Sequence, residues 1–176
     1  MRRRLYAVVA VAALGLAMPS HAEDPKKLDG GKTKKIEAKA MAAMQSHDDE
    51  QLPVSHPDRM KCAPPRCLRF DFIFAPVAGV TGDLVVHSTW GNRLTDVDLY
   101  LADDAGKQVA SCAFTGGTGE IFAVPADKLV KGKKYTVIAD FFRSVGEEVT
   151  ASVEYPAAYK ASGTTPYDWM DCALDG

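Results

Sequence analysis

Short runs of alternating apolar and polar residues, separated by turn signals, constrain this chain most strongly. In LRFDFIF, at residues 68–74, an apolar residue recurs at every second position, which places these residues on one face of a β-strand. Glycine, asparagine and aspartate recur between the runs and are typical of tight turns. The pattern predicts an all-β domain over residues 61–156, an antiparallel, jelly-roll-like β-sandwich of seven or eight strands. The seven clearest runs are LRFDFIF, DLVVHSTW, TDVDLYLAD, KQVASCAF, EIFAVP, KYTVIADFF and EEVTASVEYP.

The N-terminus has the features of a secretory signal. MRRRLYAVVAVAALGLAMPSHA begins with three arginines, continues with an apolar run and ends in small residues, which predicts a signal peptide over residues 1–22 and export to the periplasm or the cell exterior. The apolar run is too short for a membrane span. Cleavage after Ala22 would leave 18 basic and 23 acidic residues, a net charge of −5, which argues against nucleic acid as a partner.

Four cysteines, Cys62, Cys67, Cys112 and Cys172, lie in the predicted exported part. An even number in an oxidising compartment predicts two disulfides. Three pairings are open, and the sequence does not choose among them. A four-cysteine zinc site would require two close pairs of cysteines, and only one is present.

The two ends of the chain differ in composition from the sandwich. Residues 23–60 are rich in charge and alanine and contain no aromatic residue, so we expect a flexible polar leader with a short helix at 33–46, where Ile36, Ala40 and Met44 share a helical face. Residues 157–176 are expected to form an aromatic tail packed on the sandwich.

Four aspartates in TDVDLYLADDAG are the best candidates for binding a cation. A period of two puts Asp96, Asp98 and Tyr100 on the face opposite Val97, Leu99 and Leu101. Asp103 and Asp104 fall in the following turn, where aspartate serves local hydrogen bonds. Calcium would require further oxygen ligands to converge on one point. The alternative is a solvated strand face followed by an ordinary turn.

Three segments together resemble the bacterial pre-peptidase C-terminal domain: DVDLYL at 96–101, GKQVAS at 106–111 and KYTVIAD at 134–140. The resemblance covers roughly residues 68–154. It implies a small secreted β-sandwich that is usually appended to a hydrolase, assists secretion or binds substrate, and in some members binds calcium. The chain departs from this family's pattern in its four cysteines and in having no protease domain before the sandwich.

Catalytic motifs are missing from the sequence. There is no G-x-S-x-G elbow, no H-E-x-x-H helix and no glycine-rich phosphate loop that leads from a strand into a helix. His47 and His56 fall in the later part of the predicted polar leader, which links it to the sandwich, and His87 is expected to be an exposed histidine on a strand. Adjacent Glu147 and Glu148 would point to opposite faces of a strand, which is unsuitable for a carboxylate dyad.

These observations favour a non-catalytic exported binding or accessory module whose partner is a polysaccharide or a protein. A calcium-stabilised binding domain is one alternative, and a small hydrolase or hydrolase inhibitor is another, with the loop around Arg93 as the inhibitory segment. No cofactor is expected unless calcium binds. The candidate binding residues are Trp90, Arg93, Tyr100, Tyr159, Tyr167 and Trp169.

Overall fold

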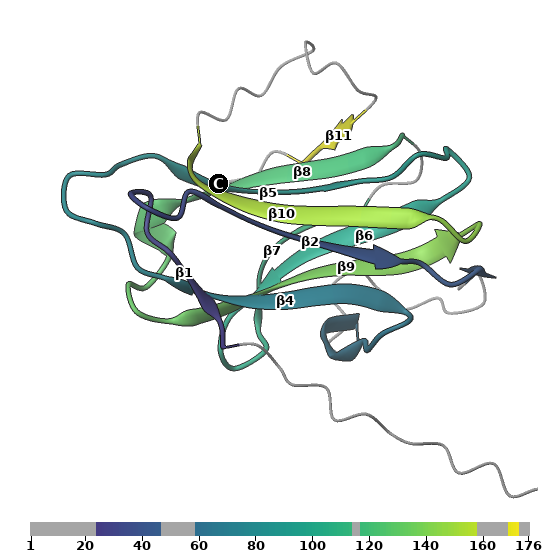
Figure 1. Cartoon of the computed structure of the whole chain (residues 1–176), viewed down its shortest axis with the longest axis horizontal. Helices are drawn as coiled ribbons and strands as arrows, with labels where there is room; N and C mark the ends of the chain where they lie inside the picture. The colour runs from purple at the N-terminus through teal and green to yellow at the C-terminus, as the bar shows by residue number, and fades with distance from the viewer. Residues whose placement is uncertain (1–23, 47–58, 114–116, 158–168, 173–176) are drawn as a thin grey trace, which may run out of the picture.

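Two β-sheets packed face to face form the protein, as a computed structural model shows (Figure 1). The structure describes residues 24–46, 59–113, 117–157 and 169–172. The predicted β-sandwich is therefore confirmed. No helix in these ranges is long and apolar enough to cross a membrane.

The first sheet, sheet A, has the order β1-β4-β9-β6-β7, and β3 pairs with a further part of β9. Its strands are β1 (Lys26–Leu28), β3 (Gln45–Ser46), β4 (Cys67–Phe74), β6 (Asp96–Ala102), β7 (Gln108–Cys112) and β9 (Lys134–Ser144). Sheet B has the order β11-β8-β5-β10-β2. Its strands are β2 (Lys35–Met41), β5 (Asp83–Thr89), β8 (Gly119–Pro125), β10 (Glu148–Ala157) and β11 (Trp169–Asp171). Two short 3₁₀ turns, Arg59–Lys61 and Ala126–Lys128, complete the described elements.

The seven predicted strands are present as β4 to β10, and their alternate, inward-facing residues form the core. In β9, Tyr135, Val137, Ala139 and Phe141 point between the sheets and are buried. Facing side chains from β4, β5, β6, β8 and β10 complete one continuous apolar cluster. Removal of these side chains from water is the main stabilising term of such a fold.

The prediction for the leader is wrong. Residues 35–41 form strand β2 in place of the expected helix, and β2 pairs with β10 along seven residues. Ile36, Ala38 and Ala40 alternate as a strand requires, while Ile36 and Ala40 also have the spacing of a helical face. Pairing with the open edge of β10 favours the strand. Since β1 pairs with β4 in sheet A, the leader contributes strands to both sheets.

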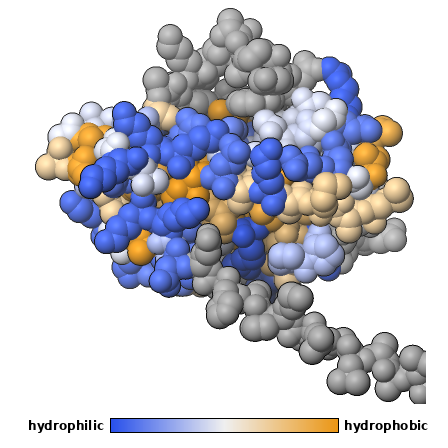
Figure 2. Space-filling view, in the orientation of Figure 1, coloured by the Kyte–Doolittle hydropathy of each residue, from blue (hydrophilic) through white to orange (hydrophobic). Residues whose placement is uncertain are grey.

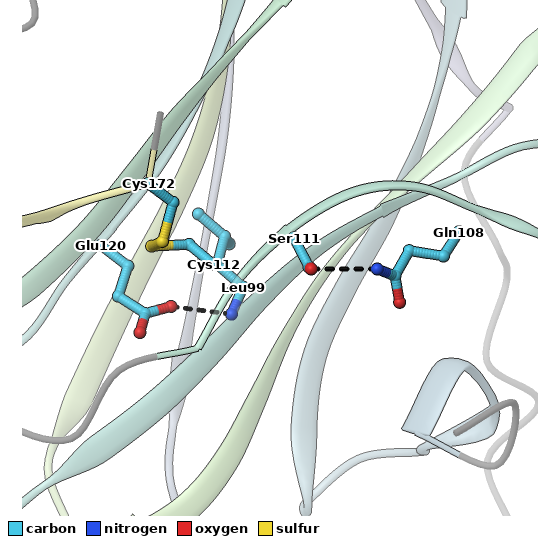
Figure 3. Close-up of a disulfide and its surroundings, with 6 residues drawn as sticks. All are labelled: Leu99, Gln108, Ser111, Cys112, Glu120 and Cys172. Carbon is cyan, nitrogen blue, oxygen red and sulfur yellow. Dashed lines mark hydrogen bonds between the residues drawn. A yellow bond between two sulfur atoms is a disulfide. The ribbon is translucent and has the colours of Figure 1, made fainter. Parts of the chain in front are cut away.

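The tail also joins the sandwich, because β11 pairs in parallel with β8 at the edge of sheet B. Cys172 follows β11 directly and forms a disulfide with Cys112 at the end of β7 in sheet A (Figure 3). The second disulfide joins Cys62 to Cys67. Of the three pairings that the sequence leaves open, the structure has this one.

A second, smaller apolar cluster lies on the outer face of sheet A. Met60, from the turn just before the Cys62–Cys67 disulfide, and Cys67 pack with Tyr100 and Ile138 there. Strand β6 is consequently buried on both faces, and every one of its residues is shielded from solvent.

The two disulfides are expected to differ in their contribution to stability. The Cys112–Cys172 link joins residues 60 apart, whereas Cys62–Cys67 joins residues 5 apart. In the loop-entropy description, removal of the long link costs about 4 kcal/mol and removal of the short link about 2 kcal/mol. Denaturant unfolding of the two double Cys→Ala variants measures this difference, and equal losses would contradict it.

Candidate functional site

The four aspartates of the candidate cation site fall into two different environments. Asp96 and Asp98 are only 2% and 6% exposed, so the prediction of a solvated face is wrong for them. Farther along the same strand, Met60 and Cys67 pack on Tyr100 and Ala102, so β6 is covered on this side as well. Asp98 accepts a hydrogen bond from the Tyr100 hydroxyl at 3.2 Å and lies opposite the buried Asp140 of β9.

Asp103 and Asp104 have the ordinary turn role. One carboxylate oxygen of Asp103 accepts hydrogen bonds from the amides of Ala105 and Lys107, at 3.0 and 2.8 Å. Asp104 forms an exposed ion pair with Lys133 at 2.8 Å, and the hydrogen bond from Lys133 lowers the pKa of this carboxyl. Within the described ranges, no group of three or more histidine, cysteine, aspartate or glutamate residues is placed to hold a metal ion. The geometry therefore gives a calcium site no support.

The aromatic candidates are largely structural. Trp90 is 6% exposed and belongs to the main core, and Tyr100 is fully buried in the smaller cluster. Tyr159 and Tyr167 lie outside the described residues. For Trp169 only the backbone is described, as part of β11. Trp90 lines a hollow beside His87 with little of its surface exposed, and among the other described aromatic residues Phe70 and Phe142 are half-buried.

The loop that carries Arg93 is held by a carboxylate that the sequence analysis did not single out. Glu147 accepts a hydrogen bond from the Gly91 amide at 2.7 Å and another from the Thr95 hydroxyl. Arg143 donates to the Leu94 carbonyl at 3.0 Å. The loop presents Arg93 and Leu94 to solvent. The sequence offers no local pattern that reveals this role of Glu147, because its contact with Gly91 spans a separation of 56 residues.

His87 lies in a polar row across the outer face of sheet B. The strand register places Glu37 of β2, Ser152 of β10 and His87 of β5 side by side. The Ser152 hydroxyl is hydrogen-bonded to His87 Nε2, and Glu154 Oε1 lies 3.7 Å from the same nitrogen. The histidine side chain is only 16% exposed, so the prediction of an exposed strand histidine is wrong.

This serine, histidine and glutamate do not have the geometry of a hydrolytic triad. In a triad, the serine and the acid bind opposite nitrogens of the imidazole ring, whereas here both approach Nε2. Ser152 is also fully buried, so its hydroxyl is closed to a substrate. The arrangement is a polar cluster within the sheet that lacks an accessible nucleophile.

Burial is the largest influence on the charge state of His87. It lowers the pKa of the imidazole, and the charge of Lys35 lowers it further. Glu154 and Glu37 act in the opposite direction without reversing the shift. The neutral ring is therefore favoured in the folded protein.

A shallow hollow of about 520 Å³ opens beside His87 on this face. Its walls carry charged and hydroxyl side chains, among them Lys35, Glu37, His87, Thr89, Glu148 and Thr150. Several are held by ion pairs: Lys35 lies 3.0 Å from Glu37, and Lys39 lies 3.0 Å from Glu148. The hollow thus offers hydrogen-bond donors and acceptors at fixed positions on a regular sheet.

Comparison with known proteins gives no family for this chain: no protein-family model matches it, and no curated protein matches it significantly. The resemblance to the pre-peptidase C-terminal domain stays a prediction from the sequence.

The lowered pKa of His87 predicts a pH dependence of stability. In the unfolded chain, His87 has the ordinary histidine pKa of about 6.5, and in the folded chain its pKa is lower. As the pH falls through about 6.5, the unfolded chain therefore takes up a proton more readily than the folded chain, and the folded state loses stability. Relative to His87→Gln, the unmodified protein should lose free energy of unfolding between about pH 7 and pH 5. Chemical denaturation at several pH values measures the difference, which would be absent or inverted if the histidine were charged when folded.

Glu147 is predicted to matter more for stability than its neighbour Glu148. Glu147→Ala removes the acceptor for the Gly91 amide and the Thr95 hydroxyl, at a cost of about 1–3 kcal/mol. Glu148→Ala removes only an exposed ion pair with Lys39, at a cost within about 1 kcal/mol. Thermal and denaturant unfolding of both variants test this order, and amide exchange at Gly91 should rise only in Glu147→Ala.

Proposed function

We propose that the protein is a non-catalytic, exported binding module that recognises a protein partner through the hollow on the outer face of sheet B. The observation that carries this proposal is the combination of an open polar hollow with a buried Ser152 beside His87. The groups that line the hollow suit recognition, while the arrangement of Ser152, His87 and Glu154 among the described residues has no accessible nucleophile.

Mixed charge at fixed positions supports a protein as the ligand. Lys35, Glu37 and Glu148 contribute both signs of charge, and Thr89 and Thr150 contribute hydroxyls. Polar groups of this kind at the rim of an interface determine register and partner choice. Strands hold them more accurately than mobile loops would.

A polysaccharide is less well supported than a protein partner. Sugar-binding surfaces on β-sandwiches depend on exposed aromatic rings, and Trp90, Tyr100 and Tyr155 are all buried. Trp90 is part of the wall of the hollow, but it is only 6% exposed and so offers little ring surface to a sugar.

Export is supported by the disulfides. Two cysteine pairs that join separate strands and loops are typical of an oxidising compartment outside the cytoplasm. Residues 1–22, which carry the signal-like sequence, lie outside the described residues. An accessory role beside a hydrolase, which the resemblance to the pre-peptidase C-terminal domain implies, belongs to the same proposal.

A variant with a filled hollow tests the function. Thr150→Trp adds bulk at a half-buried strand position that faces the hollow, and tryptophan is well accepted in strands. Affinity capture from the exported fraction of the producing organism, with quantitative mass spectrometry, should yield a protein that the unmodified chain retains and Thr150→Trp loses at least about tenfold.

Ala105→Trp is the matched control, because it adds similar bulk in the exposed turn between β6 and β7. It should retain the partner fully. Equal capture by Thr150→Trp and the unmodified chain would place the binding surface elsewhere. Hydrolysis of an ester, amide or glycoside that Ser152→Ala abolishes would show an enzyme instead.

A further inference from the structure

Strand β2 is an edge strand with room beside it. Among the described strands it pairs only with β10. A groove of about 320 Å³ lies between β2 and the strands β1 and β4 of sheet A. Its lining residues are both apolar and charged: Ile36, Ala38 and Phe70, with Asp24, Lys26, Glu37, Arg69 and Asp71. Figure 2 shows this side of the molecule, where apolar residues are visible between strongly hydrophilic ones. A strand edge of this kind exposes backbone groups that can pair with another strand.

The side chains of β2 are complementary to a second copy of the same strand. Lys35, Glu37, Lys39 and Met41 are exposed on the outer face of sheet B, and the residues between them, such as Ala38, point inward. If two copies run antiparallel about a two-fold axis at Ala38, all seven residues of each strand find a partner. Glu37 then lies opposite Lys39 of the partner subunit, and the symmetry repeats this pair.

We propose that the chain forms a homodimer in which the two β2 strands pair antiparallel about Ala38, so that two five-stranded sheets become one sheet of ten strands. On the outer face, the two opposite-charge pairs join the strands. Met41, 64% exposed in the single chain, lies opposite the aliphatic stem of Lys35 of the partner subunit. On the inner face, Ile36 lies opposite Ala40 of the partner subunit, and Ala38 lies opposite its own copy. Ala38 and Ala40, which are half-buried in the single chain, thus lose further exposed surface.

Other registers are less favourable. A shift of the axis to Glu37 sets Glu37 against its own copy and Lys35 against Lys39 of the partner subunit, and a shift to Lys39 sets that lysine against its own copy. Like charges directly opposite one another are destabilising. A shift by two residues leaves three strand residues paired, and an axis between residues would place inward side chains outward. The register about Ala38 alone combines full overlap with opposite charges.

The dimer itself does not depend on the proposed function, but its consequence for binding rests on that function. Lys35 and Glu37 line the hollow beside His87, and β2 lies at the dimer axis in this arrangement. Two hollows would thus share one face of the ten-stranded sheet, and a partner with two sites would be held by both at once.

Charge reversal and its compensation test the interface. Glu37→Lys and Lys39→Glu each replace both opposite-charge pairs with like-charge pairs, so each should raise the dissociation constant of the dimer by about tenfold or more. The double variant Glu37→Lys/Lys39→Glu restores opposite charges and should restore the affinity. The measurement is sedimentation equilibrium or light scattering of the whole chain, expressed with its own N-terminal segment, over a wide concentration range.

Asp104→Lys is the control, because it makes the same change of charge as Glu37→Lys and also removes an exposed ion pair, in the distant β6–β7 turn. It should leave the dimer unchanged, and thermal melts establish that each variant is folded. A chain that is monomeric at every concentration would overturn the proposal. The lysines of β2 would then have the opposite role, since lysine on an edge strand hinders pairing with another strand. A dimer that is indifferent to the single reversals, or is not restored in the double variant, would also overturn it.

Discussion

Burial of β6 on both faces is the constraint on which the rest of the structure depends. Its inner face packs between the sheets, and on its outer face Tyr100 and Ala102 pack against Met60 and the Cys62–Cys67 disulfide. Asp98 of β6 and Asp140 of β9 are consequently shielded from water, side by side in the strand register. Carboxylates in such a place must be compensated by hydrogen bonds or charges from the protein itself, as the Tyr100 hydroxyl does for Asp98.

The two sheets are also tied together by a polar contact inside the sandwich. Glu120 of β8 is fully buried and accepts a hydrogen bond from the Leu99 amide of β6 at 2.9 Å. Figure 3 shows this contact beside the disulfide that joins Cys112 to Cys172. A buried carboxylate is unfavourable unless it is hydrogen-bonded, so Glu120 fixes how β8 lies against β6 in a way that apolar packing alone does not. The covalent link and the hydrogen bond thus act on the same pair of layers.

The seven central strands could be predicted because each buries one face, so that apolar residues recur at every second position of the sequence. The structure of the leader could not be predicted, since Ile36 and Ala40 fit a helix as well as a strand. Only pairing with the open edge of β10 favours the strand over the helix. Alternation also places Asp98 and Tyr100 on one face of β6, where the Tyr100 hydroxyl donates a hydrogen bond to Asp98. It could not say that this face is covered, because the cover comes from residues about thirty-five positions earlier, around Met60. The signals that were missed are all non-local.

The same limit explains why the row through His87 was misjudged. Glu37, Ser152 and His87 come from three strands that are distant in sequence, and only the sheet register brings them together. Proximity of a serine, a histidine and a carboxylate invites a catalytic interpretation, but catalysis requires the acid and the nucleophile on opposite ring nitrogens and a hydroxyl that a substrate can reach. Ser152 fails both requirements. What remains is a polar surface of both charge signs on the outer face of sheet B, and the proposed function depends on complementarity of charge and hydrogen bonding to that surface.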